Sequence, residues 1–100
     1  MKALIYHGPG KKSLEEVPVP VLTADSDAIV RILRTTICGT DLHILKGDVP
    51  TVTEGRILGH EGVGMIEQAG PGVTGFHKGD EVLISCITAC GKCDNCRRGM

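Results

Sequence analysis

Hydrophobic residues along this chain form short runs that are separated by glycine-rich or proline-rich stretches. Residues 28–37 (AIVRILRTTI) form the clearest run, because they are rich in the β-branched side chains that favour strands. Residues 14–20 (LEEVPVP) carry alternate prolines, which confine an extended segment to the edge of a sheet. Further strands are predicted at 2–7, 62–70 and 81–86. Short strands with turns about every ten residues favour a β-barrel or sandwich over βαβ units.

One short helix interrupts this strand pattern. Residues 39–48 (GTDLHILKGD) predict it, with Thr40 or Asp41 as the N-terminal cap and Gly47 as the end. The chain is therefore predicted to be mainly β with a single short helix.

A glycine-rich stretch follows the strand predicted at residues 62–70. Residues 70–75 (GPGVTG) match G-x-G-x-x-G, the pattern of dinucleotide-binding folds. That pattern must also open a helix and be followed by an acidic residue about 20 positions later. A turn and the strand at 81–86 follow instead, so the match is interpreted as a turn, and no Rossmann half is predicted in this chain.

Composition narrows the classes of function. The 100 residues are enough for one domain, and 41% hydrophobic residues with a net charge of -1 are typical of a globular protein. Tyr6 and Phe76 are the only aromatic residues and the basic residues are scattered, so we expect neither nucleic acid nor a membrane as partner. No segment approaches the ~20 apolar residues of a membrane span, and the first apolar run is too short for a secretory signal. We therefore expect a cytoplasmic protein.

Three of the five cysteines are clustered near residue 100. In a reducing cytosol an odd number of clustered cysteines favours metal binding or catalysis over disulfides. Cys90, Cys93 and Cys96 have C-x2-C-x2-C spacing, which suits zinc. An iron–sulfur cluster is the alternative, but its ferredoxin motif continues with x3-C-P, and Met100 occupies the place of that fourth cysteine.

The fourth ligand of this cysteine loop is open between two candidates. One is a cysteine downstream of Cys96, and the other is Cys86, although the strand pattern predicts that Cys86 ends a strand as a small buried residue. A site with four protein ligands leaves no open position, so it would be structural and not catalytic.

A second group of candidate residues lies earlier in the chain. Cys38 precedes the predicted helix and His60 precedes a strand, and together they could supply two ligands of a metal site with an open position. Asp41 can orient His60 by accepting its second ring N–H, as carboxylates beside metal-bound histidines do. Thr40 and His43 add a hydroxyl and an imidazole that can move protons. Thr40 and Asp41 also suit a capped surface helix, and both interpretations can hold together.

Three motifs in a fixed order resemble the N-terminal part of the zinc-dependent alcohol dehydrogenases of the medium-chain dehydrogenase/reductase superfamily. They are CGTDLH at 38–43, GHEGVGMIEQAGPGV at 59–73, which fits the family's zinc signature G-H-E-x2-G-x5-G-x2-V, and CGKCDNC at 90–96. The resemblance covers essentially all of residues 1–100. It implies a mainly β fold, a GroES-like and partly open β-barrel with a short helix and a zinc-binding loop, to which the complete protein would add an α/β Rossmann domain.

The resemblance also implies roles for individual residues. Cys38 and His60 would be ligands of a catalytic zinc, as in the Cys₂His site of alcohol dehydrogenase, and Glu61 would ligate it transiently. Thr40 would hydrogen-bond the alcohol oxygen and start a proton relay. The outer end of that relay would be His43, while Asp41 would support His60. The three clustered cysteines would be ligands of a separate structural zinc: Cys90, Cys93 and Cys96.

The implied activity is the oxidation of a small-molecule alcohol, or the reduction of an aldehyde or ketone, by hydride transfer to NAD or NADP. The complete protein would be a homo-oligomer, a dimer or a tetramer. We expect residues 1–100 to be a truncated N-terminal part that is inactive alone. Gly39 departs from relatives in which an arginine or histidine at this position contacts the cofactor pyrophosphate. A stand-alone zinc-binding β-module and a small iron–sulfur electron carrier are the alternatives.

Overall fold

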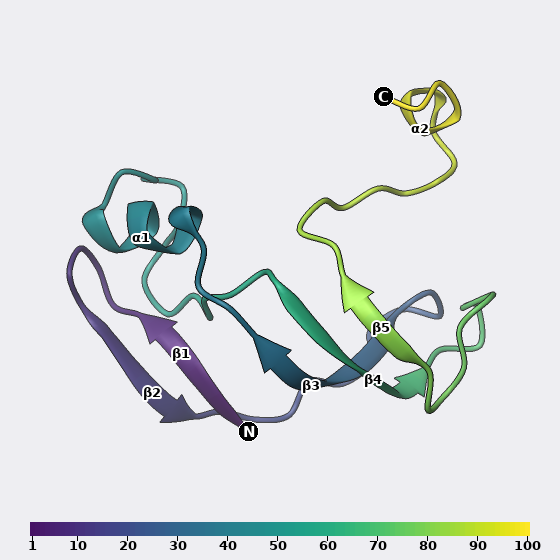
Figure 1. Ribbon diagram of the computed structural model, residues 1–100, viewed down its shortest axis with the longest axis horizontal. Coiled ribbons are helices and arrows are strands. Elements are labelled where there is room, and N and C mark those ends of the chain that lie inside the picture. Colours follow the sequence, from purple (N-terminus) through teal and green to yellow (C-terminus); the bar gives the residue numbers. More distant parts are fainter.

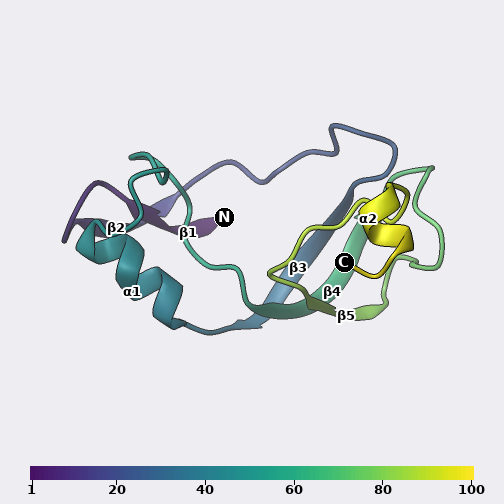
Figure 2. The same cartoon turned by 90° about the horizontal axis from the view of Figure 1, so that it is seen from above.

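Two open antiparallel sheets form the frame of the molecule. The computed structural model describes all residues from 1 to 100. The first sheet is a hairpin of β1 (Lys2–Tyr6) and β2 (Lys12–Glu16), and the second has the order β3 (Ala28–Thr35), β4 (Gly62–Ala69), β5 (Glu81–Ile84). Helix α1 (Gly39–Lys46) lies over the hairpin, whereas α2 (Asp94–Arg97) lies at the end of a long extension beyond β5 (Figures 1 and 2). The fold is therefore mainly β, as the sequence predicted, and its sheets are open and do not close into a barrel.

The segment that leads to His60 is attached to the edge of β1. Tyr6 donates its backbone N–H to the carbonyl of Arg56 at 2.9 Å, and Leu58 donates to the carbonyl of Leu4 at 2.9 Å. Ile5, one of the few buried residues of the core, pairs with Ile57 in an isolated β-bridge. These contacts with β1 therefore fix the path of the chain towards the start of β4.

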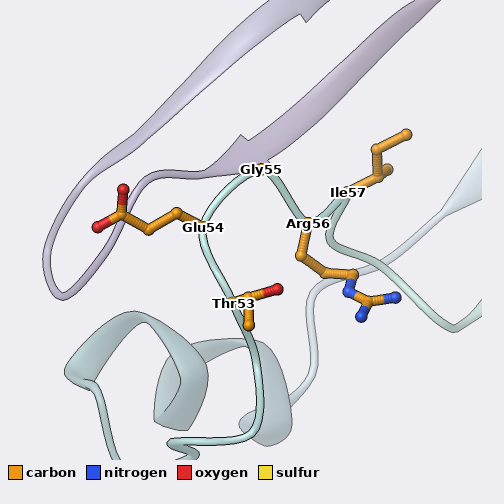
Figure 3. Close-up of a pocket in the computed structure, with 5 residues that line it drawn as sticks. All are labelled: Thr53, Glu54, Gly55, Arg56 and Ile57. Carbon is orange, nitrogen blue, oxygen red and sulfur yellow. The ribbon is translucent and has the colours of Figure 1, made fainter.

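A shallow pocket lies along this same segment, lined by Thr53, Glu54, Gly55, Arg56 and Ile57. Figure 3 shows the Glu54 side chain directed at the loop of the β1–β2 hairpin, while Arg56 points away from it. A Cβ at Gly8 of that loop would come within 3.0 Å of Glu54 Oε1, so the two loops are in contact. None of the residues predicted to carry chemistry lines this pocket.

Strands β3 and β4 approach each other closely at a glycine. Thr35 pairs with Gly62 and Ala28 with Ala69, with irregularities between Ile29 and Val30 and after Ile32. A Cβ at Gly64 would lie 2.4 Å from the carbonyl oxygen of Arg31, a distance that no side chain tolerates. Glycine at this position of β4 is thus required for the pairing of the two strands.

The glycine-rich stretch at residues 70–75 is a turn that packs on another turn. Gly70 and Gly72 donate their backbone N–H groups to the carbonyls of Asp27 and Asp25, both at 2.9 Å. A Cβ at Gly70 would lie 2.3 Å from the Asp25 carbonyl oxygen. No helix follows before β5, which confirms that these glycines are not a dinucleotide fingerprint.

Three local predictions were wrong at the ends of elements. Strand β2 starts at Lys12 and ends at Glu16, before the prolines, which lack the N–H that a ladder needs. Helix α1 is capped by Cys38, and Asp41 occupies its third position, although Gly47 ends the helix as predicted. Cys86 is exposed and lies beyond β5, because Ile84 is paired with Gly62, the first residue of β4, and no partner remains for later residues. The four-residue helix α2 was not predicted. Neither helix is long and apolar enough to cross a membrane.

Candidate metal centre

The thiol of Cys38 and the imidazole of His60 are in contact. Cys38 Sγ lies 3.0 Å from His60 Nε2, although 22 residues separate them in the chain. The β3–β4 ladder ends at the pair of Thr35 and Gly62, where Cys38 lies shortly after the end of β3 and His60 shortly before the start of β4. Next to this pair, Thr35 Oγ1 donates to the Glu61 carbonyl at 2.6 Å. The antiparallel ladder therefore carries the two side chains to the same point.

Asp41 is the buried acid of this group, with 6% of its surface exposed. Its Oδ2 accepts the backbone N–H of Cys38 at 2.9 Å, which ties the carboxylate to the helix N-terminus. Its Oδ1 is buried without a hydrogen-bond partner and lies 4.0 Å from His60 Nδ1. A buried, unpaired carboxylate oxygen is costly. An N–H on Nδ1 of His60 could satisfy it after a small movement.

This donor set fits a zinc ion. Thiolate and neutral imidazole are zinc ligands, with bonds of about 2.3 and 2.0–2.1 Å. A tetrahedral ion holds such sulfur and nitrogen atoms about 3.6 Å apart, so Cys38 and His60 would separate by roughly half an ångström to accept it. With Nε2 bound to metal, Nδ1 would carry its hydrogen towards Asp41, which explains why that buried oxygen faces the ring.

Thr40 and His43 lie one turn apart on the exposed surface of α1. The Thr40 hydroxyl makes no hydrogen bond within the chain, and His43 Nδ1 is 3.0 Å from Oδ2 of Asp48. The Glu61 side chain is exposed and stands outside the group formed by Cys38, Asp41 and His60. Sequence reasoning missed Asp48; its signal is the Gly-Asp pair that follows the helix.

The second cluster gathers Cys90, Cys93 and Cys96 around the start of α2. Cys96 Sγ lies 3.8 Å from Cys90 Sγ and 3.5 Å from Cys93 Sγ. A tetrahedral zinc with bonds of about 2.3 Å to sulfur separates its thiolates by about 3.8 Å. Cys96 is already close to this spacing from both other cysteines, and all three sulfurs lie within 4.8 Å of one another. Cys86 lies outside this cluster.

The backbone of the loop favours the thiolate form of Cys90. The N–H groups of Lys92 and Cys93 point at its sulfur, the latter at 3.4 Å, and lower the pKa of the thiol from 9.0 to about 7. The side chains of Cys93 and Cys96 act in the same direction. Since the thiolate is the form that binds metal, the lowered pKa of Cys90 favours binding of a metal cation by the loop.

Comparisons with known proteins place this geometry in context. A family model described as "Alcohol dehydrogenase GroES-like domain" matches residues 24–100. The zinc-type alcohol dehydrogenase-like protein AdhB of Bacillus subtilis is 40% identical over 97 residues, which are 97% of this chain and 26% of AdhB. The apo form of zinc dependent alcohol dehydrogenase 2 from Streptococcus pneumoniae is 60% identical with a TM-score of 0.94, over 99% of this chain and 28% of that structure.

A more distant solved structure carries a cofactor. An alcohol dehydrogenase from Escherichia coli CFT073, complexed with NADH, is 32% identical with a TM-score of 0.77. The match covers 99% of this chain and 28% of that one. The chain therefore spans about a quarter of the length of the proteins that it matches.

Proposed function

The chain belongs to the alcohol dehydrogenase GroES-like domain family, and from this premise we propose that it forms part of the catalytic site of a zinc-dependent alcohol dehydrogenase. The reaction is the transfer of a hydride from a small alcohol to NAD or NADP, or its reverse from the reduced cofactor to an aldehyde or ketone. The contact of Cys38 Sγ with His60 Nε2, beside the unpartnered Oδ1 of Asp41, is the observation that carries this proposal.

Cys38 and His60 hold the catalytic zinc in this proposal, with a third ligand supplied from outside residues 1–100. Bound there, zinc would supply Lewis acidity, which would lower the pKa of an alcohol hydroxyl in the open position. Asp41 accepts the Nδ1 hydrogen of His60 and so directs the Nε2 lone pair towards the metal. Glu61 is close in sequence and serves as a transient ligand.

The proton and the hydride of the alcohol leave in different directions. Thr40 accepts a hydrogen bond from the alcohol hydroxyl with its otherwise unbonded side chain, and His43 passes the proton on to water from its exposed position on α1. A nicotinamide held outside residues 1–100 would supply the hydride acceptor for the alcohol carbon. The alcohol thus loses one hydride and one proton, and a carbonyl compound results.

The cysteine loop has a structural task in this proposal. Cys90, Cys93 and Cys96 hold a second zinc, and its fourth ligand is a cysteine downstream of Cys96 in preference to Cys86, which is exposed outside the cluster. The sulfur spacing of 3.5 and 3.8 Å supports zinc at this position.

The remaining parts of the enzyme lie outside these residues. The relatives are about four times as long, which supports residues 1–100 being the N-terminal part of a GroES-like catalytic domain. A Rossmann domain would bind the cofactor, and the NADH in the Escherichia coli neighbour supports a nicotinamide. In this arrangement the 100 residues do not catalyse alone, and the complete protein is a dimer or tetramer.

Metal content and turnover test the proposal together. The complete protein, loaded with zinc, should hold two zinc ions per chain and reduce NAD or NADP in the presence of an alcohol. Cys38→Ser should lose one zinc and all turnover, whereas the matched variant Cys86→Ser should keep both. Zinc binding without any alcohol-dependent reduction of cofactor would indicate a zinc module without activity, and iron with sulfide would indicate an electron carrier; either result would overturn the proposal.

A further inference from the structure

Helix α1 ends in a Schellman motif that joins His43 to Asp48. Gly47 has a left-handed backbone (φ 88°) and donates its N–H to the Ile44 carbonyl at 2.9 Å. The N–H of Asp48 reaches back to the carbonyl of His43 at 3.0 Å. These two bonds define the motif, in which the residue after the glycine lies beside the helical residue five positions earlier.

The side chains at these two positions usually form an apolar contact. Here they are an imidazole and a carboxylate, and His43 Nδ1 lies 3.0 Å from Asp48 Oδ2. One backbone bond and one side-chain bond therefore connect the same two residues. The backbone bond belongs to the helix end and does not depend on the side chain, so it keeps residue 48 beside the histidine whatever side chain it carries.

The pair selects one tautomer of His43. An ionised carboxylate only accepts hydrogen bonds, so the nitrogen that faces Asp48 must carry the hydrogen. The neutral ring then has its hydrogen on Nδ1 and a free lone pair on Nε2. Nε2 makes no hydrogen bond within the chain, and 61% of the side chain is exposed. The nitrogen available to accept a proton from outside is therefore Nε2.

We propose that Asp48 is a positioning residue that holds His43 in the Nδ1–H tautomer and leaves Nε2 as the proton acceptor at the outer end of the relay. The role in the relay rests on the proposed function, whereas the tautomer itself does not. Asp48 is 54% exposed, and ion pairs at such exposure add little to stability. The effect of Asp48 is thus on the position of a hydrogen and on proton transfer, with little effect on folding.

A second histidine–aspartate pair in the chain provides an internal control. His77 Nδ1 lies 3.7 Å from Asp80 Oδ2, and that oxygen accepts the backbone N–H of His77 at 2.7 Å. The ring of His77 is 83% exposed and has no hydrogen bond of its own. Its tautomer should therefore be that of an unrestrained histidine, mainly Nε2–H, and should not respond to changes at residue 48.

Nitrogen NMR of ¹⁵N-histidine-labelled protein, at a pH where the rings are neutral, measures the tautomers. Wild-type His43 should show a protonated Nδ1 and a bare Nε2. Asp48→Ala removes the acceptor but keeps the backbone bond. In this variant the chemical shifts of His43 should show a bare Nδ1 and a protonated Nε2, the reverse of wild type. Asp48→Asn keeps an oxygen acceptor and should preserve the Nδ1–H form. Wild-type His43 as mainly Nε2–H, or an unchanged pattern in Asp48→Ala, would overturn the proposal.

Turnover separates this inference from the proposed function. In the complete zinc-loaded protein with cofactor and alcohol, Asp48→Ala should lower kcat with KM unchanged, by less than the roughly 100-fold that loss of a general acid or base costs. Asp48→Asn should retain most of the rate. Turnover in Asp48→Ala equal to wild type would refute the role of Asp48 in the relay. A complete protein without any turnover would refute the proposed function, while the tautomer would still be read from the spectra.

Discussion

The buried Oδ1 of Asp41 faces Nδ1 of His60 across 4.0 Å and has no other partner. This arrangement leaves a carboxylate oxygen unsatisfied until the ring turns its N–H towards it. Metal binding by Nε2 would favour the form of His60 that carries its hydrogen on Nδ1. The position of Asp41 in the metal-free site therefore already suits the metal-bound form of the ring.

Asp41→Asn should weaken zinc binding at the Cys38–His60 site about 10- to 100-fold, the usual cost of losing such a partner. An amide that keeps its oxygen on the Cys38 N–H must turn its NH₂ group towards His60, where it opposes the Nδ1 hydrogen. Competition with a chelator of known affinity measures the change. Asp25→Asn, on an exposed aspartate, is the matched control. Equal zinc affinity in Asp41→Asn and wild type would contradict the role assigned to Asp41.

Gly64→Ala should destabilise the β3–β4 pairing by about 1–3 kcal/mol, as overpacking of a close contact does. The new Cβ would lie 2.4 Å from the Arg31 carbonyl oxygen and 2.6 Å from Val30 Cγ1, and the first of these is backbone that cannot rotate away. Urea unfolding measures the free-energy change. Gly39→Ala has open space around its Cβ and should be nearly neutral, so a similar loss in both variants would show that close approach is not the cause.

Acid should destabilise the turn at residues 23–27. The Thr23 hydroxyl, then the backbone N–H groups of Ala24 and Thr23, hold the pKa of Asp27 below its ordinary 3.8. Because the folded-state pKa is the lower one, this contribution to stability is complete above about pH 3.8 and is lost as the pH falls through the folded value. Hydrogen exchange at the Gly70 and Gly72 amides, which bond to this turn, should accelerate over that range relative to amides of the β1–β2 hairpin.

Asp27→Asn is the variant that checks this assignment. It should remove the part of the acid dependence at Gly70 and Gly72 that comes from the turn, since residue 27 then no longer titrates. An acid response at these two amides as steep in the variant as in wild type would assign the effect to another carboxylate.

Cys96→Ser should lose the zinc of the cysteine loop and keep that of the Cys38–His60 site. Cys96 is central to the cluster, because its sulfur is within 3.8 Å of both others, and a zinc loop without one of its thiolates binds weakly. In the complete protein, zinc content by mass spectrometry should fall from two ions to one per chain, and protease cleavage at Arg97 and Arg98 should accelerate. Cys86→Ser should behave as wild type; loss of a zinc in that variant would make Cys86 the fourth ligand.

Many structural features of this protein could be predicted from its sequence because they depend on residues that are close together in the chain. Runs of β-branched residues predicted β3, Gly47 predicted the end of α1, and C-x2-C-x2-C spacing brought Cys90, Cys93 and Cys96 together within one loop. Such features depend on backbone preferences over a few residues, and neighbours along the chain suffice to establish them. The order of three short motifs was likewise enough to indicate the family.

Tertiary structure decided how distant groups are brought together. The contact of Cys38 with His60 follows from the pairing of Thr35 with Gly62. This register depends on both strands and cannot be deduced from the sequence of either one. The exposure of Cys86 follows from where β4 begins, because β5 can pair only as far as Gly62, the first residue of its neighbour. The bond between His43 and Asp48 required the left-handed turn at Gly47 to bring the chain back on itself. Sequence determines the available chemistry, and long-range hydrogen bonding determines which of these groups can act together.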